Sequence, residues 1–118
     1  MPSHGLSRGE VERIESESYQ HAREDMRRHR VVDLVASCRL DLKWINERLE
    51  RFGGELEPAQ AGELRELARE LAMMVDLASA DWAAVDPDAM HATKQRLDEA
   101  SVRLQEIAIT HSLKQDEA

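Results

Sequence analysis

The chain contains a long stretch with neither glycine nor proline, from Glu10 to Phe52. Ser7 and Glu10 have the spacing of a capping box, so this stretch should begin as a helix. If it is continuous, the helix is on the order of 65–70 Å long, which exceeds the usual length of a globular helix. The alternative is a bend or a break, which we expect within the polar residues 15–30.

The two halves of this stretch carry different patterns. In the second half, apolar residues recur in steps of three and four, the spacing of a helix that packs along a bundle seam. These residues are Val35, Cys38, Leu42, Ile45, Leu49 and Phe52. The first half has few apolar residues and no such period. A helix of that kind either spans solvent between two parts of a protein or packs against something outside its own bundle.

Two further helices are predicted after short turns. The glycine pair 53–54 should end the first helix with a left-handed cap. Pro58 precedes a second helix over residues 59–80, and Asp86-Pro87 supplies a cap and a first-turn proline for a third helix that ends near Ser112. No alternating apolar and polar run is long enough to predict a strand.

The apolar positions of these two helices complete the predicted bundle core. They are Leu64, Leu67, Leu71 and Met74 in the second helix and Met90, Leu97, Leu104 and Ile107 in the third. Three helices with short connections predict an all-α fold in which a long N-terminal helix leads into an antiparallel three-helix bundle. We assign residues 1–30 to a helical arm, 31–113 to the bundle and 114–118 to a frayed tail.

Composition narrows the classes of function. The net charge of −8 argues against a general nucleic-acid binder, although Arg23, Arg27 and Arg30 share one helical face and could contact an acidic partner. Cys38 is the only cysteine, which fits a reducing, cytoplasmic compartment, and its place on the seam indicates a core residue. The histidines lack metal-ligand spacing, and no apolar run is long enough to span a membrane. We therefore expect no catalytic site, no metal site and no membrane contact.

Three segments, taken in order, resemble one known family. The opening "GLSRGEVERI" is followed by "HAREDMRRHR", with an Ala-x-x-Asp and a basic run. Downstream, "ERLERFGGELEP" has a helix-ending glycine with a following leucine and proline, and "QRLDEASVRLQEIA" is similar to a last helix. Over nearly the whole chain, these segments resemble the C-terminal helical lid of DnaK-type, seventy-kilodalton heat-shock chaperones.

The resemblance implies a lid that closes over a peptide-binding β-sandwich and slows the release of unfolded polypeptide clients. ATP and Mg²⁺ would belong to a separate ATPase domain of the parent chain, on which J-domain and nucleotide-exchange co-chaperones act. The helices themselves would need no cofactor and would not be an enzyme. Docking on the sandwich would use Leu6, Val11, Ile14 and Tyr19, and we expect the same exposed residues to make the isolated chain a homo-oligomer.

Two positions in the middle of the long helix depart from the family pattern, where an asparagine and an aspartate of the family fall at Ala36 and Arg39. That aspartate, which helps to latch the lid to the sandwich, is replaced by Arg39 in this chain. This implies either a partner of reversed charge or a looser closure. General chaperones and the branch that serves iron–sulfur-cluster assembly both remain open as the subtype. A stand-alone helical interaction or dimerisation adaptor is the alternative from a different class, and it rests on the seam between Val35 and Phe52.

Overall fold

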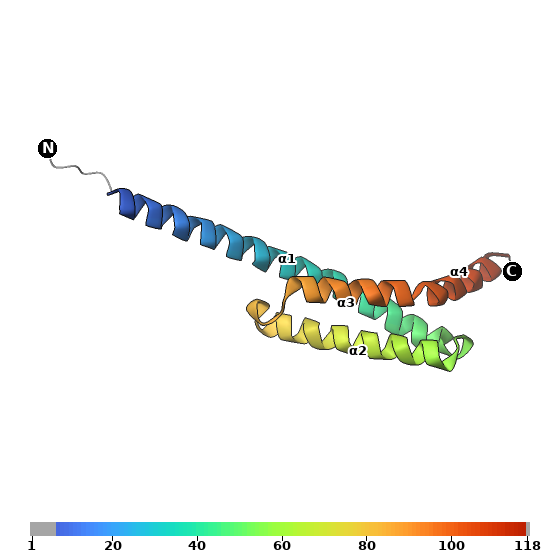
Figure 1. The fold of residues 1–118 in the computed structure, drawn as a ribbon. Helices are drawn as coiled ribbons and strands as arrows, with labels where there is room; N and C mark the ends of the chain where they lie inside the picture. The colour runs from blue at the N-terminus through green and yellow to red at the C-terminus, as the bar shows by residue number, and fades with distance from the viewer. Residues whose placement is uncertain (1–6, 118) are drawn as a thin grey trace.

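The structure is a computed structural model that describes residues 7–117, and within that range it is built from helices and short turns. The elements are α1 (Arg8–Phe52), the 3-10 turn η1 (Gly53–Glu55), α2 (Pro58–Ala80), the 3-10 turn η2 (Trp82–Ala84), α3 (Pro87–Ala100) and α4 (Val102–Glu117). Figure 1 shows α1 running the length of the molecule and α2 returning antiparallel to it. α3 and α4 then run opposite to α2, in the same general direction as α1. The prediction of an all-α antiparallel bundle with a long first helix is confirmed.

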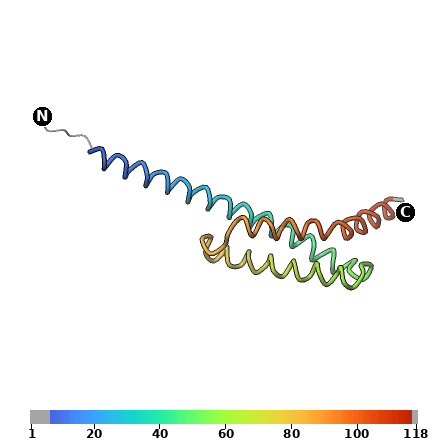
Figure 2. The backbone as a smooth tube through the Cα atoms, in the orientation of Figure 1, coloured from blue at the N-terminus to red at the C-terminus, as the bar shows by residue number. Residues whose placement is uncertain are grey.

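α1 is a single helix of 45 residues. Its capping box is formed as predicted: the Glu10 N–H donates to the Ser7 hydroxyl at 3.2 Å, and the Ser7 N–H donates to the Glu10 carboxylate at 3.4 Å. The alternative of a break within residues 15–30 is wrong, because the helix continues through them without interruption (Figure 2). Most residues there are of types that favour a helix even without packing, such as Glu, Arg, Gln, Ala and Met.

The end of α1 differs from the expected left-handed cap. Gly53 lies in the right-handed region, with φ −58° and ψ −28°, and no glycine within residues 7–117 has a positive φ. The chain instead tightens into η1, where the N–H of Leu56 donates to the carbonyl of Gly53 at 3.2 Å. This right-handed turn brings Leu56 into the core, where only 7% of it stays exposed, so apolar burial favours it over the left-handed cap.

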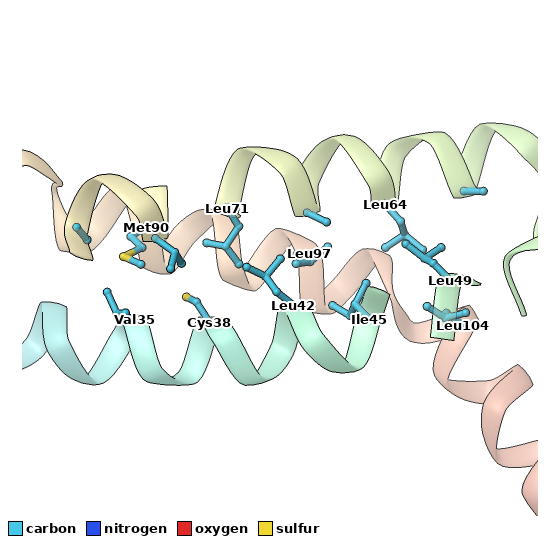
Figure 3. Close-up of a cluster of buried hydrophobic side chains, with 14 of the residues drawn as sticks. Val35, Cys38, Leu42, Ile45, Leu49, Leu64, Leu71, Met90, Leu97 and Leu104 are labelled. Atoms are coloured by element: carbon cyan, nitrogen blue, oxygen red, sulfur yellow. The ribbon is translucent and has the colours of Figure 1, made fainter. Parts of the chain in front are cut away.

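The core lies between α1, α2 and the α3–α4 pair (Figure 3). All of the residues predicted for it are buried except Leu67 and Met74, which are half-buried and pack against it. On α2 the buried face is turned slightly from the predicted one. It consists of Ala61, Leu64, Ala68, Leu71, Val75 and Ala78. The smaller residues Ala68 and Val75 thus take the places expected for Leu67 and Met74.

The predicted third helix is divided at Ser101, which is 1% exposed. Its hydroxyl donates to the carbonyl of Asp98 at 2.8 Å and accepts from the side-chain amide of Gln105 at 2.9 Å. This buried hydroxyl therefore has a partner both as a donor and as an acceptor. Figure 2 shows the chain changing direction between α3 and α4. α4 then continues through residues 114–117, which the sequence had assigned to a frayed tail.

The molecule is strongly elongated. The radius of gyration of its Cα atoms is 22.4 Å and its extents are 87 × 29 × 20 Å, whereas a compact chain of this length would have a radius of gyration of roughly 13 Å. The projecting first part of α1 accounts for the difference (Figure 1). In the part of the chain that the structure describes, no helix is both long and apolar enough to cross a membrane.

Candidate interaction surface

The first half of α1 projects from the bundle as an arm, which we define as residues 8–30. Every residue of the arm is exposed, and Val31, which is 0% exposed, is the first to enter the core. The exposed arm includes Val11 at 38%, Ile14 at 42%, Tyr19 at 65% and Met26 at 72% exposure. Val11, Ile14 and Tyr19 were predicted as docking residues. Leu6, the fourth, lies outside the described residues.

The apolar residues of the arm share one side of α1. At 3.6 residues per turn, they fall within a sector of roughly 140°. We call this set the arm stripe; it comprises Val11, Ile14, Tyr19, Ala22 and Met26. The bundle-facing residues Val31, Val35 and Cys38 project on roughly the opposite side of the helix axis. The stripe therefore turns away from the side of α1 that packs within its own chain.

A shallow groove continues the stripe along α1 beyond the arm. It is lined by Met26, His29, Arg30, Asp33, Leu34 and Ser37. Leu34 is half-buried and packs against the core, so the groove connects the exposed stripe to the edge of the bundle. The candidate surface is thus one elongated face rather than an enclosed pocket.

Charge is distributed unevenly along the arm. Residues 8–18 carry four carboxylates and two arginines, whereas residues 19–30 carry four arginines and two carboxylates. The first half therefore has a net charge of −2 and the second half a net charge of +2. Because both halves are exposed, the arm presents opposite charges at its two ends.

Two arginines fix the base of the arm to the connection between α2 and α3. The guanidinium of Arg27 donates to the carbonyl of Val85 at 3.4 Å and lies 5.9 Å from the ring centroid of Trp82. Arg30 forms an ion pair with Asp88 at 2.6 Å. The sequence favoured a solvated face for these arginines, with contact to an acidic partner as the alternative. It missed the contacts because it could not show which turn lies beside residues 27–30.

Arg39, the residue at the expected latch position, bonds within the chain. Its guanidinium donates to the hydroxyl of Ser79 at 2.7 Å, and that hydroxyl donates to the carbonyl of Val75 at 2.8 Å. The contact joins α1 to the C-terminal end of α2. Arg39 also lies beside Val32 and Trp82 on the lining of a surface groove between these helices. The guanidinium of Arg39 thus has a hydrogen-bond partner within the chain at the bundle surface.

A charged cluster lies between α1 and α3. The Lys94 ammonium is 2.9 Å from the carboxylate of Asp41 and 3.0 Å from that of Asp98. The pKa of Lys94 is raised, mainly by the hydrogen bond to Asp41. Burial, reinforced by the nearby Asp41, raises the pKa of Asp98. Two acidic groups therefore share one cation, and the cluster ties the two helices together.

Cys38 lies beside this cluster and is 0% exposed. Desolvation raises its pKa from the ordinary 9.0 to about 11. A thiol of this kind stays protonated at neutral pH, and it is the thiolate that acts as a nucleophile. The environment of Cys38 is thus that of a packed core residue.

Comparison with known proteins identifies no relative: no family model, no curated protein and no solved structure matches the chain. The features that bear on function are accordingly those of the molecule itself. They are an elongated apolar stripe on an exposed arm, opposite charges at the two ends of that arm, and a well-packed bundle that anchors it. Together they define the arm as a candidate interaction surface.

Proposed function

We propose that this chain is the helical lid of a DnaK-type chaperone of the cytoplasm, with its arm docked on a peptide-binding β-sandwich. The observation that carries the proposal is the arm stripe, in which Val11, Ile14 and Tyr19 remain exposed on a fully formed helix. An apolar stripe on a helix is normally buried against another element. The order of the sequence motifs, which resembles that of DnaK-type lids, supports a β-sandwich as that element.

In this proposal the two parts of the chain have separate tasks. The arm supplies apolar contact with the sandwich, and the bundle keeps the distal part of the lid rigid. Closure over a bound peptide blocks its exit, so the lid acts mainly on the dissociation rate. We assign no catalytic role to these helices, because nucleotide chemistry belongs to a separate ATPase domain in the proposed architecture.

Arg39 bears on how such a lid closes. Its side chain is directed to Ser79 on α2, where it supports the packing of α1 on α2. We propose that closure in this protein depends on the arm stripe more than on a charged latch. Exchanging Arg39 for Ala should then change bundle stability while leaving peptide release within about twofold of the parent lid.

The test is a fusion of residues 5–112 to the β-sandwich of a DnaK-type chaperone. With the helices present, a fluorescent apolar peptide should dissociate about tenfold more slowly than from the sandwich alone. Replacing Ile14 by Glu places a charge on the stripe and should remove most of the slowing, whereas Glu24→Gln, on the bundle-facing side of the arm, should not. Equal dissociation rates with and without the helices would overturn the proposal.

An adaptor that binds partners through its helices is the second candidate. It is favoured by a separate set of exposed apolar residues on α4, namely Val102 at 50%, Ile109 at 60% and Leu113 at 58% exposure. Their spacing places them on the side of α4 opposite the buried Leu104 and Ile107. If this function holds, Ile109→Glu should abolish binding of the partner while the fusion above shows no effect on peptide release.

A further inference from the structure

The charges along the arm are complementary to the charges of a second arm that runs in the opposite direction. Its first half is acidic and its second half is basic, and the arm stripe runs through both. When two such helices lie antiparallel, the acidic half of each meets the basic half of the other. When they lie parallel, like charges meet along their whole length. Complementary charge of this kind selects orientation in helix pairs.

We infer that a second copy of this chain binds the arm stripe, with the two arms antiparallel about a two-fold axis near Tyr19. Such an interface is isologous, so each contact occurs twice. With the axis at Tyr19, Glu15 of one copy lies level with Arg23 of the second copy. Val11 lies within one residue of the level of Met26 of the second copy. Apolar contact then forms the centre of the pair and opposite charges flank it.

The like charges that this register also brings together are already neutralised within each chain. Arg8 would lie level with Arg30 of the second copy. Arg8 pairs with Glu12 at 3.5 Å, and Arg30 pairs with Asp88 at 2.6 Å. Both arginines can therefore keep an acidic neighbour in the pair. Tyr19 stacks beside Arg23, whose guanidinium carbon is 5.8 Å from the ring centroid, so the residues at the axis are preorganised.

The pairing goes beyond the proposed lid function and uses the same stripe. A stripe covered by a second copy is not available to a β-sandwich, so self-pairing and docking exclude each other. Self-pairing would hold unattached or open lids in a state in which their apolar residues are covered. This inference is tested on the chain alone, and its failure would leave the peptide-release test of the lid untouched.

The experiment uses two charge reversals, Glu15→Arg and Arg23→Glu, measured by sedimentation equilibrium. In a dimer of either variant alone, like charges meet at both symmetry-related contacts between residues 15 and 23. Its dimer dissociation constant should therefore rise about tenfold relative to the parent chain. Mixing the two variants restores both opposite-charge contacts in the mixed pair. The mixture should therefore dimerise within about threefold of the parent.

Glu24→Arg is the matched control, because it makes the same change in net charge on the bundle-facing side of the arm. It should leave the dissociation constant within about twofold of the parent. Circular dichroism of each variant checks that the arm stays helical. A parent chain that is monomeric at high micromolar concentration would overturn the inference. A dimer that both reversals leave intact, or one that mixing does not restore, would overturn it as well.

Discussion

At the scale of single residues, a fully buried thiol, Cys38, lies beside the Lys94 ammonium, which is paired with two carboxylates between α1 and α3. Cys38 was identified as a core residue because it lies on the seam, and it is fully buried. Lys94 was not identified, because its partner Asp41 lies on another helix far away in the sequence. Nothing in the local pattern shows that α3 places a lysine beside that carboxylate. Cross-helix polar pairs of this type depend on the final packing of the helices.

The buried thiol predicts how stability changes in alkaline solution. Burial raises the pKa of Cys38 from 9.0 to about 11, so between these values the folded chain holds a proton that the unfolded chain has lost. Stability should therefore fall as pH rises through this window, by about 2–3 kcal/mol from this group. Urea unfolding of the parent chain and of Cys38→Ala from pH 8 to pH 11 measures the difference. Identical pH slopes would show that the thiol titrates normally.

The cluster around Lys94 predicts the cost of removing its cation. In Lys94→Met the carboxylates of Asp41 and Asp98 face each other with no cation between them, and we expect the free energy of unfolding to fall by about 1–3 kcal/mol at neutral pH. Because pairing raises the pKa of Lys94, its contribution is complete below the ordinary lysine pKa and is lost as pH rises through the folded-state pKa.

Lys43→Met is the matched control for this substitution, because Lys43 is exposed on α1. It should change the free energy of unfolding by less than about 0.5 kcal/mol. Urea unfolding followed by circular dichroism measures both variants. If the two lysine variants lose equal stability, the cluster does not tie α1 to α3.

At the scale of elements, the sequence predicted where the helices begin better than it predicted the buried face of α2. Adjacent apolar residues such as Leu67 with Ala68, or Met74 with Val75, leave two faces of α2 available. Both sets have steps of three and four, and the structure buries the one that runs from Ala61 to Ala78. That regular spacing is present in the sequence, but small residues such as Ala68 are easily passed over in favour of larger neighbours. The local spacing does not separate the two faces, and the packed bundle buries Ala68 and Val75 while Leu67 and Met74 lie half-buried at its edge.

The division of the third helix follows from a similar cause. Its buried positions include Thr93 and Ser101, which an apolar criterion ignores. Two successive steps of four, from Thr93 through Leu97 to Ser101, interrupt the seam, and a step of this kind changes the local winding of packed helices. α4 then follows a new direction and contacts the end of α1, where the ring of His111 stacks on Phe52 at 4.7 Å.

The exposure of the arm predicts that it can be broken without unfolding the bundle. Ser18→Pro removes a helical hydrogen bond in a segment whose residues are all exposed, so helical signal should fall while the urea midpoint of the bundle stays unchanged. Ala36→Pro is the matched variant within the bundle, also at an exposed position. It should cost about 3 kcal/mol or more. Equal destabilisation by the two prolines would show that arm and bundle unfold as one unit.

At the scale of the whole molecule, shape connects the fold to both proposals. The arm contributes to a longest dimension of 87 Å, against 29 and 20 Å in the other two directions. An arm of this length offers a surface of about 35 Å along its axis. Its stripe faces away from the bundle side of α1, so an occupant reaches it without disturbing the core. The same geometry suits a docked β-sandwich or a second arm.

The shape of the self-paired molecule gives the last prediction. Antiparallel arms place the two bundles at opposite ends, with centres separated by the shared arms on the order of 70–80 Å. Small-angle X-ray scattering of the dimer should then give a pair-distance distribution with a second peak near that separation. Parallel arms, or a contact between two α4 helices, would bring the bundles together and give a single peak. Ser18→Pro, which breaks the arm, should remove the second peak together with the dimer, and a second peak that survives it would contradict pairing through an intact arm.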